Sequence, residues 1–376
     1  FFFKIALGMS GGVDSSLCAH LLKEQGHEVT GVYLECWRAP GCRRDEDRAD
    51  ALKVALSLGL PFEVLDFKDA YRDKVVEYFF AEYEAGRTPN PDVLCNKEIK
   101  FGMFYDLSIQ NGFDAIATGH YAETNEAGEL LIPKDAHKDQ TYFLYLLTSQ
   151  QLKHVIFPLA QLQKSEVRTL AEESGIHVAH KDDSVGICFI GDINVHAFLK
   201  ERLGENPGEV VNTQGTVIGR HTGLWFYTIG QRHGFDIDKK TAYRSADGEI
   251  IEKENFPPFY VISKNATKNQ LIVGFGAETL QKCFTIHDLH WIAGVLPASL
   301  EHLLVRIRHT GALLPCGLTF DGSTAHISLN RPTQGIAEGQ SAVFYQKNAT
   351  GDTMCLGGGP IDHSDAPLDA SAIVPL

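Results

Sequence analysis

The stretch best suited to chemistry lies near the start of the chain, where Gly8 to Ser16 read GMSGGVDSS. It follows the apolar run Lys4 to Met9 and leads into a helix-like pattern from Ser15 to Gln25. Backbone N–H groups and the positive end of a helix would therefore converge on one point, which suits a phosphate. The stretch lacks the Gly-Lys-Ser/Thr ending of Walker A and the GxGxxG spacing of a dinucleotide site. A plain glycine turn with Asp14 as a helix cap explains the small residues equally well.

Two cysteines stand in strings of unusual composition. Cys95 follows TPNPDVL, in which two prolines make the backbone stiff, and Cys188 lies in DDSVGICFIG. Lys97 and Lys100 would favour a thiolate at Cys95 if they lie close to it in space. Taken singly, each cysteine is more readily a packed core residue, because a free thiol behaves as a small hydrophobic group.

Length and composition limit the class of protein. The chain has 376 residues, 44% hydrophobic and 22% charged, which predicts two or three packed domains. No apolar run is long enough to cross a bilayer and no signal peptide is evident, so we expect a cytoplasmic protein without membrane contact. The eight cysteines form no CxxC pair and no cluster of zinc-finger type, so we expect no structural metal site.

The net charge of -14 argues against a protein that binds nucleic acid through a general basic surplus. It does not exclude local basic patches. Candidates for such patches are Lys134, Lys138, Lys153, Lys164 and Lys181 in one stretch and Arg306 and Arg308 further along.

The order of elements predicts an α/β domain followed by β-rich parts. Strand-like and helix-like segments alternate from Lys4 to about Asp114, which indicates right-handed βαβ units around a parallel sheet. Helical patterns continue at Gln140–Leu147 and Lys164–Ser174, where Ser165 is placed to cap the second. After Pro207 short alternating segments with many glycines are typical of small sheets and barrels. The predicted domains are residues 1–205, 206–278 and 279–376.

Six strings together resemble one known family. SGGVDS alone resembles the PP-loop of the ATP pyrophosphatases, which cleave ATP between the α- and β-phosphates and transfer AMP. With TPNPDVLCN, ATGHYA, KDQTYFL, GICFIG and TIGQRHG, the chain resembles the bacterial tRNA-specific 2-thiouridylase (MnmA/TrmU) family over nearly its whole length. The resemblance implies a parallel-sheet PP-loop catalytic domain, a small central domain and a C-terminal β-barrel. It also implies a sulfurtransferase that uses ATP with Mg²⁺ to replace the C2 oxygen of the wobble uridine with sulfur.

Site residues follow from the resemblance by position. Cys95 matches the nucleophile and Cys188 the persulfide carrier, with a disulfide between them during turnover, while Asp92 matches a residue at the target base. The ATP-binding positions are Gly8, Met9, Ser10, Gly11, Gly12, Val13, Asp14, Ser15, Leu34 and Gly119.

The resemblance also implies partners. These are tRNA and a cysteine desulfurase or sulfur-relay protein as sulfur donor, and we expect a monomer. His309 stands where we expect a tyrosine in the family. The positions that match tRNA contacts are Asn90, Pro91, Asp92, His120, Lys138, Asp139, Gln140, Arg308, His309 and Gln340.

Three other functions remain open from the sequence. A PP-loop ligase that forms an amide from a small molecule and ammonia would need neither Cys95 nor Cys188. An RNA-binding protein with an inactive nucleotide fold would not need Asp14 and Ser15. A 4-thiouridine or 2-thiocytidine enzyme would carry further RNA-binding domains or paired CxxC ligands, which this sequence lacks.

Overall fold

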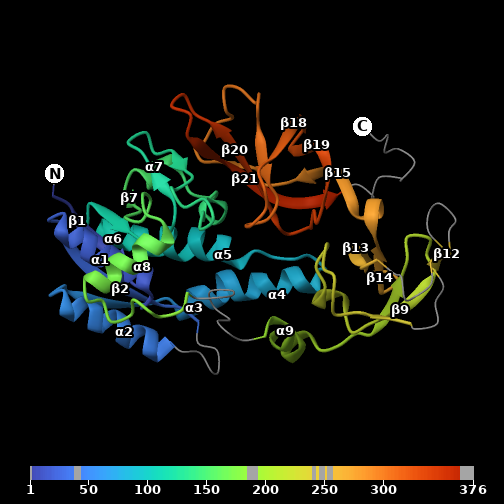
Figure 1. Ribbon diagram of the computed structural model, residues 1–376, viewed down its shortest axis with the longest axis horizontal. Helices are drawn as coiled ribbons and strands as arrows, with labels where there is room; N and C mark the ends of the chain where they lie inside the picture. The colour runs from blue at the N-terminus through green and yellow to red at the C-terminus, as the bar shows by residue number, and fades with distance from the viewer. Residues whose placement is uncertain are drawn as a thin grey trace.

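The predicted order of an α/β part, a small central part and a barrel is confirmed by the computed structural model (Figure 1). In Figure 1 the barrel lies above the α/β part, and the central sheet lies to the right of both. Cys188 is outside the described residues. The structure describes residues 2–37, 44–183, 194–238, 243–244, 250–251 and 257–364.

The α/β part is built on five parallel strands in the order β3-β2-β1-β4-β7. The chain leaves the central strand β1 toward β2 and β3 and returns to its other side as β4. This reversal creates a crevice beyond the carboxyl ends of β1 and β4, the place where open parallel sheets bind ligands. The strands are β1 (Lys4–Gly8), β2 (Glu28–Glu35), β3 (Phe62–Asp66), β4 (Ala115–Ala117) and β7 (Val155–Ile156).

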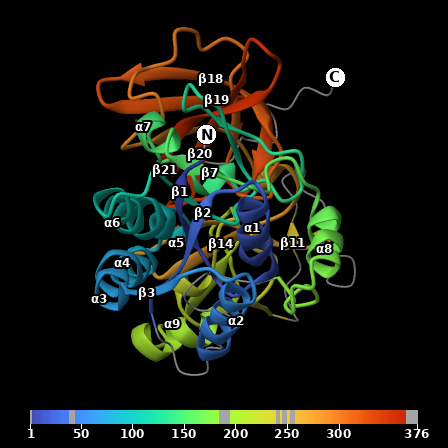
Figure 2. The ribbon, with the colours of Figure 1, turned by 90° about the vertical axis from the view of Figure 1, so that its left-hand side faces the viewer.

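Helices cover both faces of this sheet, as Figure 2 shows for α1 and α8 on one side and α3, α4 and α6 on the other. Side chains alternate along β1, so that Ile5 and Leu7 pack toward α1 and α8 while Ala6 packs toward the other face. On the first side lie α1 (Val13–Glu24), α2 (Arg44–Ser57) and α8 (Lys164–Glu173). On the second lie α3 (Lys68–Tyr71), the π-helix η1 (Arg72–Val76), α4 (Glu77–Glu84), α5 (Pro91–Leu94), the π-helix η2 (Cys95–Phe104) and α6 (Tyr105–Gln110).

Two local predictions are wrong. The segment Gln140–Leu147 forms only a 3₁₀ turn, η3 (Thr141–Phe143), followed by turns. Tyr142, Leu144, Tyr145 and Leu147 are all buried, so the segment packs on several sides rather than along one helical stripe. Ser165 does not cap α8, because Gln163 occupies the cap position and its backbone N–H donates to the Glu166 carboxylate.

The central part holds a five-stranded sheet in the order β10-β9-β8-β14-β13. Its core includes Val210, Ile218, Leu271 and the fully buried Tyr227. A separate pair, β11 (Tyr243–Arg244) and β12 (Ile250–Ile251), lies nearby in sequence. The sheet strands are β8 (Gly208–Val211), β9 (Val217–His221), β10 (Asp236–Ile237), β13 (Tyr260–Asn265) and β14 (Gln270–Gly274), preceded by α9 (Val195–Leu203).

Six antiparallel strands close the C-terminal barrel, in the order β15-β19-β18-β17-β20-β21, with β21 pairing back to β15. They are β15 (Leu280–Ile286), β17 (Leu304–Arg306), β18 (Leu314–Asp321), β19 (Thr324–Gln334), β20 (Ser341–Lys347) and β21 (Thr353–Ser364).

The barrel sheet continues into the α/β part. Strand β21 also pairs with β6 (Leu130–Leu131), which pairs with β5 (Glu123–Thr124). Main-chain hydrogen bonds therefore join the two parts directly. The limits 1–205, 206–278 and 279–376 remain a prediction. Among the described residues, no helix combines the length and the apolar character that a membrane span requires.

Candidate functional site

The loop after β1 lies in the crevice between β1 and β4 and depends on glycine. Gly11 has a φ of +79°, and a side chain there would collide with the Asp47 carbonyl oxygen. Gly12 occupies the cap position of α1, which receives no side-chain cap. Asp14 is therefore not the helix cap, and the first N–H groups of α1 remain available to an anion. Ser15 holds the turn, because its Oγ accepts a hydrogen bond from the Ser10 backbone N–H at 3.1 Å.

The second predicted ATP element meets this loop. Gly119 follows β4, and a Cβ atom there would lie 2.9 Å from the Ser15 backbone nitrogen. Gly8, Met9 and Val13 are contiguous with the loop, while Leu34 on β2 is partly buried against the core. Glycine at positions 11 and 119 thus allows backbone segments to approach closely around the positive end of α1.

Charged side chains surround the loop. The Asp14 carboxylate accepts hydrogen bonds from Lys164 Nζ at 2.6 Å and from the Tyr121 hydroxyl at 2.9 Å. Burial acts to raise the pKa of Asp183, but hydrogen bonds from Lys138 and Lys164 outweigh it and lower the pKa to about 2. A negatively charged ligand would therefore enter a site that already contains two lysine ammonium groups.

A further lysine closes the other side of the loop. Lys181 Nζ donates to the Gly11 carbonyl oxygen at 3.1 Å and pairs with Asp47 and Asp50 at 2.7 and 2.6 Å. The described residues contain no cluster of three or more side chains ready to hold a metal ion. Asp14 is the carboxylate nearest the loop centre by sequence, and Lys164 occupies one of its oxygens.

Cys95 opens the π-helix η2 directly after α5. Asn90 is the cap residue of α5, Pro91 is its first residue, and Asp92 is one turn before Cys95. Only 3% of the surface of Cys95 is exposed, so a large substrate cannot reach it without some opening. Lys97 Nζ lies 3.6 Å from the Glu98 carboxylate, and Lys100 Nζ approaches Nε2 of His120.

Helix η2 links Cys95 to the nucleotide loop. Lys100 Nζ lies 3.5 Å from Nε2 of His120, the neighbour of Gly119. A Cβ atom on Gly8 would lie 3.6 Å from the Phe104 ring. The helix that begins at Cys95 therefore runs along the crevice at the ends of β1 and β4.

Three of the predicted tRNA contacts are buried, namely Pro91, His120 and Asp139. His120 stacks near Phe101 and shares a 2.8 Å hydrogen bond with Thr118, and burial together with Lys100 lowers its pKa well below the ordinary value. Asp139 pairs with Arg306 at 2.6 Å, with only 1% and 9% of the two side chains exposed. The His120 and Asp139 side chains therefore contact other protein groups.

The other predicted contacts lie closer to the surface. Gln140 accepts a hydrogen bond from the Tyr121 backbone at 2.9 Å, and Arg308 is exposed. His309 stacks 4.3 Å from Phe143, with its Nδ1 atom buried and without a hydrogen-bond partner in the structure. Burial lowers the pKa of His309, and the charge of Asp139 acts to raise it.

Comparison with known proteins identifies the family. A tRNA methyl transferase HUP domain model matches residues 3–192, a tRNA methyl transferase PRC-barrel domain model matches 196–275, and an aminomethyltransferase beta-barrel domain model matches 281–361. The tRNA-specific 2-thiouridylase MnmA of Listeria monocytogenes serotype 4a is 43% identical over 371 residues, which cover 96% of this chain and 94% of that protein. The chain belongs to the tRNA-specific 2-thiouridylase family.

Other relatives agree with this assignment. The 2-thiouridylase MnmA of Nitrosomonas europaea is 42% identical over 369 residues, 95% of this chain and 98% of its own. Among solved structures, the U34-tRNA thiolase NcsA from Methanococcus maripaludis covers 53% of this chain and 64% of its own at 21% identity, with a TM-score of 0.35. That similarity is too low for the two sites to be compared.

The basic stretch of this 2-thiouridylase family member is largely paired with acids. Within the described part of the chain, Arg306 is buried against Asp139, while Arg308 and Lys153 are exposed. Four lysines form ion pairs: Lys134 with Glu166, Lys138 with Asp183, Lys164 with Asp14 and Asp183, and Lys181 with Asp47 and Asp50.

Sequence reasoning missed the roles of Tyr121, Asp183 and Lys164 at the nucleotide loop. Lys164 is 150 positions from Asp14, so no local spacing signals their contact.

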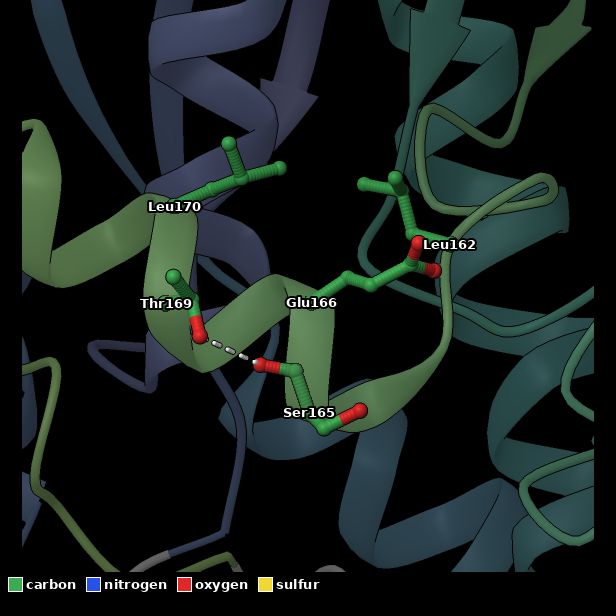
Figure 3. Close-up of a pocket in the computed structure, with 5 residues that line it drawn as sticks. All are labelled: Leu162, Ser165, Glu166, Thr169 and Leu170. Atoms are coloured by element: carbon green, nitrogen blue, oxygen red, sulfur yellow. Dashed lines mark hydrogen bonds between the residues drawn. The ribbon is translucent and has the colours of Figure 1, made fainter.

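A hollow along α8 is not a second candidate for the active site, because the only carboxylate among the described residues that line it, Glu166, already pairs with Lys134. Figure 3 shows that hollow, in which the Thr169 hydroxyl donates to the Ser165 carbonyl oxygen at 3.1 Å. It is lined by Leu162, Ser165, Glu166, Thr169 and Leu170.

Proposed function

We propose that this protein is a tRNA 2-thiouridine synthase, a sulfurtransferase acting on the wobble uridine of lysine, glutamate and glutamine tRNAs. The products are 2-thiouridine, AMP and pyrophosphate. The observation that carries the proposal is the course of η2, which begins at Cys95 and reaches His120 beside Gly119. A cysteine and a nucleotide loop on one crevice suit a reaction that first activates a substrate and then attacks it with sulfur.

ATP is held by Gly8–Ser15 and Gly119, with Leu34 at the adenine. The close backbone approach that Gly11 and Gly119 permit and the uncapped start of α1 support this assignment. Mg²⁺ enters with the nucleotide, because Mg²⁺ prefers oxygen ligands and usually binds through substrate phosphates and one or two carboxylates. Asp14 is the carboxylate of the loop itself. ATP supplies the AMP group that turns the C2 oxygen of uracil into a phosphate ester able to leave.

Sulfur transfer uses the two cysteines. The terminal sulfur of a persulfide on Cys188 bonds to C2 of the base, and AMP departs with the former C2 oxygen. The Cys95 thiolate then attacks the Cys188 sulfur, the persulfide bond breaks, and sulfur remains on the base. The two cysteines are left as a disulfide, which a thiol reductant reopens with two electrons. Asp92, one turn before Cys95, orients or deprotonates the edge of the base.

The tRNA enters with its anticodon loop. A base in this loop is unstacked at low cost and can turn into a closed pocket, which the burial of Cys95 requires. Asn90, Pro91 and Asp92 meet the base, while Lys138, Gln140, Arg308, His309 and Gln340 meet the surrounding RNA, with Asp139 and His120 behind them. A cysteine desulfurase or relay protein loads Cys188, and the enzyme works as a cytoplasmic monomer.

The test is nucleoside mass spectrometry of an unmodified glutamate tRNA after incubation with the protein, ATP, Mg²⁺ and a cysteine desulfurase. We expect 2-thiouridine, and none in a matched tRNA that carries cytidine at the wobble position. Cleavage of ATP to AMP without a thiolated base, but with incorporation of ammonia into a small acid, would favour the amide-forming ligase.

A further inference from the structure

The segment before α5 is held by all three parts of the molecule. From the central sheet, Lys264 Nζ on β13 donates to the Gly86 carbonyl oxygen at 2.8 Å, and Thr228 shares a 3.1 Å hydrogen bond with the Thr88 hydroxyl. From the barrel, the Glu338 carbonyl oxygen accepts the Thr88 backbone N–H at 2.9 Å. The Gln340 amide donates to the carbonyl oxygens of Thr88 and Pro89 at 3.0 and 3.2 Å. Gln340 thus holds this segment through its side-chain amide nitrogen.

The packing around the segment leaves little freedom. Gly339 has a φ of +84°, and a Cβ atom there would lie 2.9 Å from the Thr88 carbonyl oxygen and 3.0 Å from the Arg87 Cβ. Arg87 lies just after the end of α4, and its guanidinium donates two hydrogen bonds to the carboxylate of Glu82 in that helix. The central part therefore holds the chain just before Asn90 at two points, the Gly86 carbonyl and the Thr88 hydroxyl.

Lys264 carries the strongest of these contacts. It is partly buried, burial lowers its pKa to about 8, and Glu338 is the charged group that acts on it in the opposite sense. A buried ammonium group is costly unless it is paired and hydrogen-bonded, and hydrogen bonds from charged groups are stronger than neutral ones. The contact with Gly86 and the charge of Glu338 satisfy that condition.

We propose that Lys264 is a positioning residue for the thiolation reaction: it anchors the Gly86 carbonyl and so fixes the start of the helix that carries Asp92 and Cys95. The inference rests on the proposed function. Asn90 occupies the position just before α5, so a shift at Gly86 is transmitted over four residues to the start of the helix and then to the cysteine. The nucleotide loop is held by other residues, Ser15 and Lys181, and is unaffected.

The test compares full-length Lys264→Met, Lys264→Arg and the exposed control Lys268→Met in the tRNA thiolation assay. We expect kcat/KM for tRNA to fall by about tenfold in Lys264→Met, since a charge-assisted hydrogen bond is lost. The KM for ATP stays at the wild-type value. Lys264→Arg recovers most of the loss because it keeps a charged donor, and Lys268→Met equals wild type.

Two outcomes overturn the inference. One is a Lys264→Met enzyme with wild-type kcat/KM for tRNA; the other is an equal loss for ATP and tRNA together with a lower melting temperature, which marks a merely structural role. If Lys264→Met fails to fold, Thr228→Val removes a neighbouring anchor on the same segment and must give the same selective loss for tRNA. Absence of thiolation by the wild-type protein would instead reject the proposed function.

Discussion

The buried pair Asp139–Arg306 provides the sharpest test of how the barrel is joined to the catalytic part. Asp139 accepts from the Thr141 backbone N–H and hydroxyl at 2.9 and 2.7 Å through Oδ1, and from Arg306 Nη1 at 2.6 Å through Oδ2. The Arg306 guanidinium also lies over the Tyr345 ring at 5.0 Å. Both carboxylate oxygens therefore accept hydrogen bonds. An asparagine side chain has only one oxygen and cannot accept all of them.

Asp139→Asn should destabilise the protein by about 3–5 kcal/mol, because it leaves the Arg306 charge buried without a counterion. Arg306→Met should cost a similar amount by leaving the Asp139 charge. The double variant removes both charges, so its loss should be clearly smaller than the sum of the single losses.

Urea unfolding followed by circular dichroism and by tryptophan fluorescence measures these losses. Both probes should report one transition, since main-chain pairing between β21 and β6 joins the barrel to the α/β part. The reasoning is refuted if either single variant loses less than about 1 kcal/mol, or if the losses in the double variant simply add.

Three further predictions follow from the site. Gly119→Ala should weaken ATP binding at least about tenfold, because the added Cβ meets the Ser15 backbone, while Gly317→Ala, where the Cβ has room, should leave it unchanged in calorimetric titration. Lys138→Met should weaken tRNA binding and reduce its salt slope by about one, and filter binding at several salt concentrations with no change in slope would contradict this. The pKa of His120 is lowered in the folded state, so below pH 6.5 the unfolded state binds more protons than the folded state. Acidification should therefore destabilise the wild-type protein more than the His120→Gln variant, by up to about 1.4 kcal/mol per pH unit. Denaturant melts at pH 8 and pH 5.5 check this, with the exposed His180→Gln behaving like wild type.

The sequence predicted those features that depend on local patterns. The parallel sheet, the loop at the end of β1 and the short strands of the barrel follow from alternation and glycine placement, which local chain geometry decides. The segment after Gln140 was predicted as a helix because its apolar residues recur at helical spacing, whereas packing against the barrel on several sides favours turns.

Long-range contacts lay beyond the sequence. Asp139 and Arg306 are 167 positions apart. Strands β6 and β21 pair although the whole central part lies between them in the sequence. Sequence similarity pointed to Asp139 and His120 as RNA contacts, but only packing shows that both are covered. Lys264 lies in no recognisable sequence motif, and only the folded structure shows its hydrogen bond to the Gly86 carbonyl oxygen.

The most direct test of the account is a single-turnover sulfur transfer. Wild type, Cys95→Ser, Cys188→Ser and the control Cys283→Ser are loaded with ³⁵S by a desulfurase, freed of excess donor, and mixed with ATP, Mg²⁺ and unmodified tRNA. The account predicts that wild type and Cys283→Ser release labelled tRNA, that Cys95→Ser holds the label in a disulfide link between Cys188 and the base, and that Cys188→Ser carries none to transfer. Free labelled tRNA from Cys95→Ser or Cys188→Ser at the wild-type level would contradict the two-cysteine mechanism.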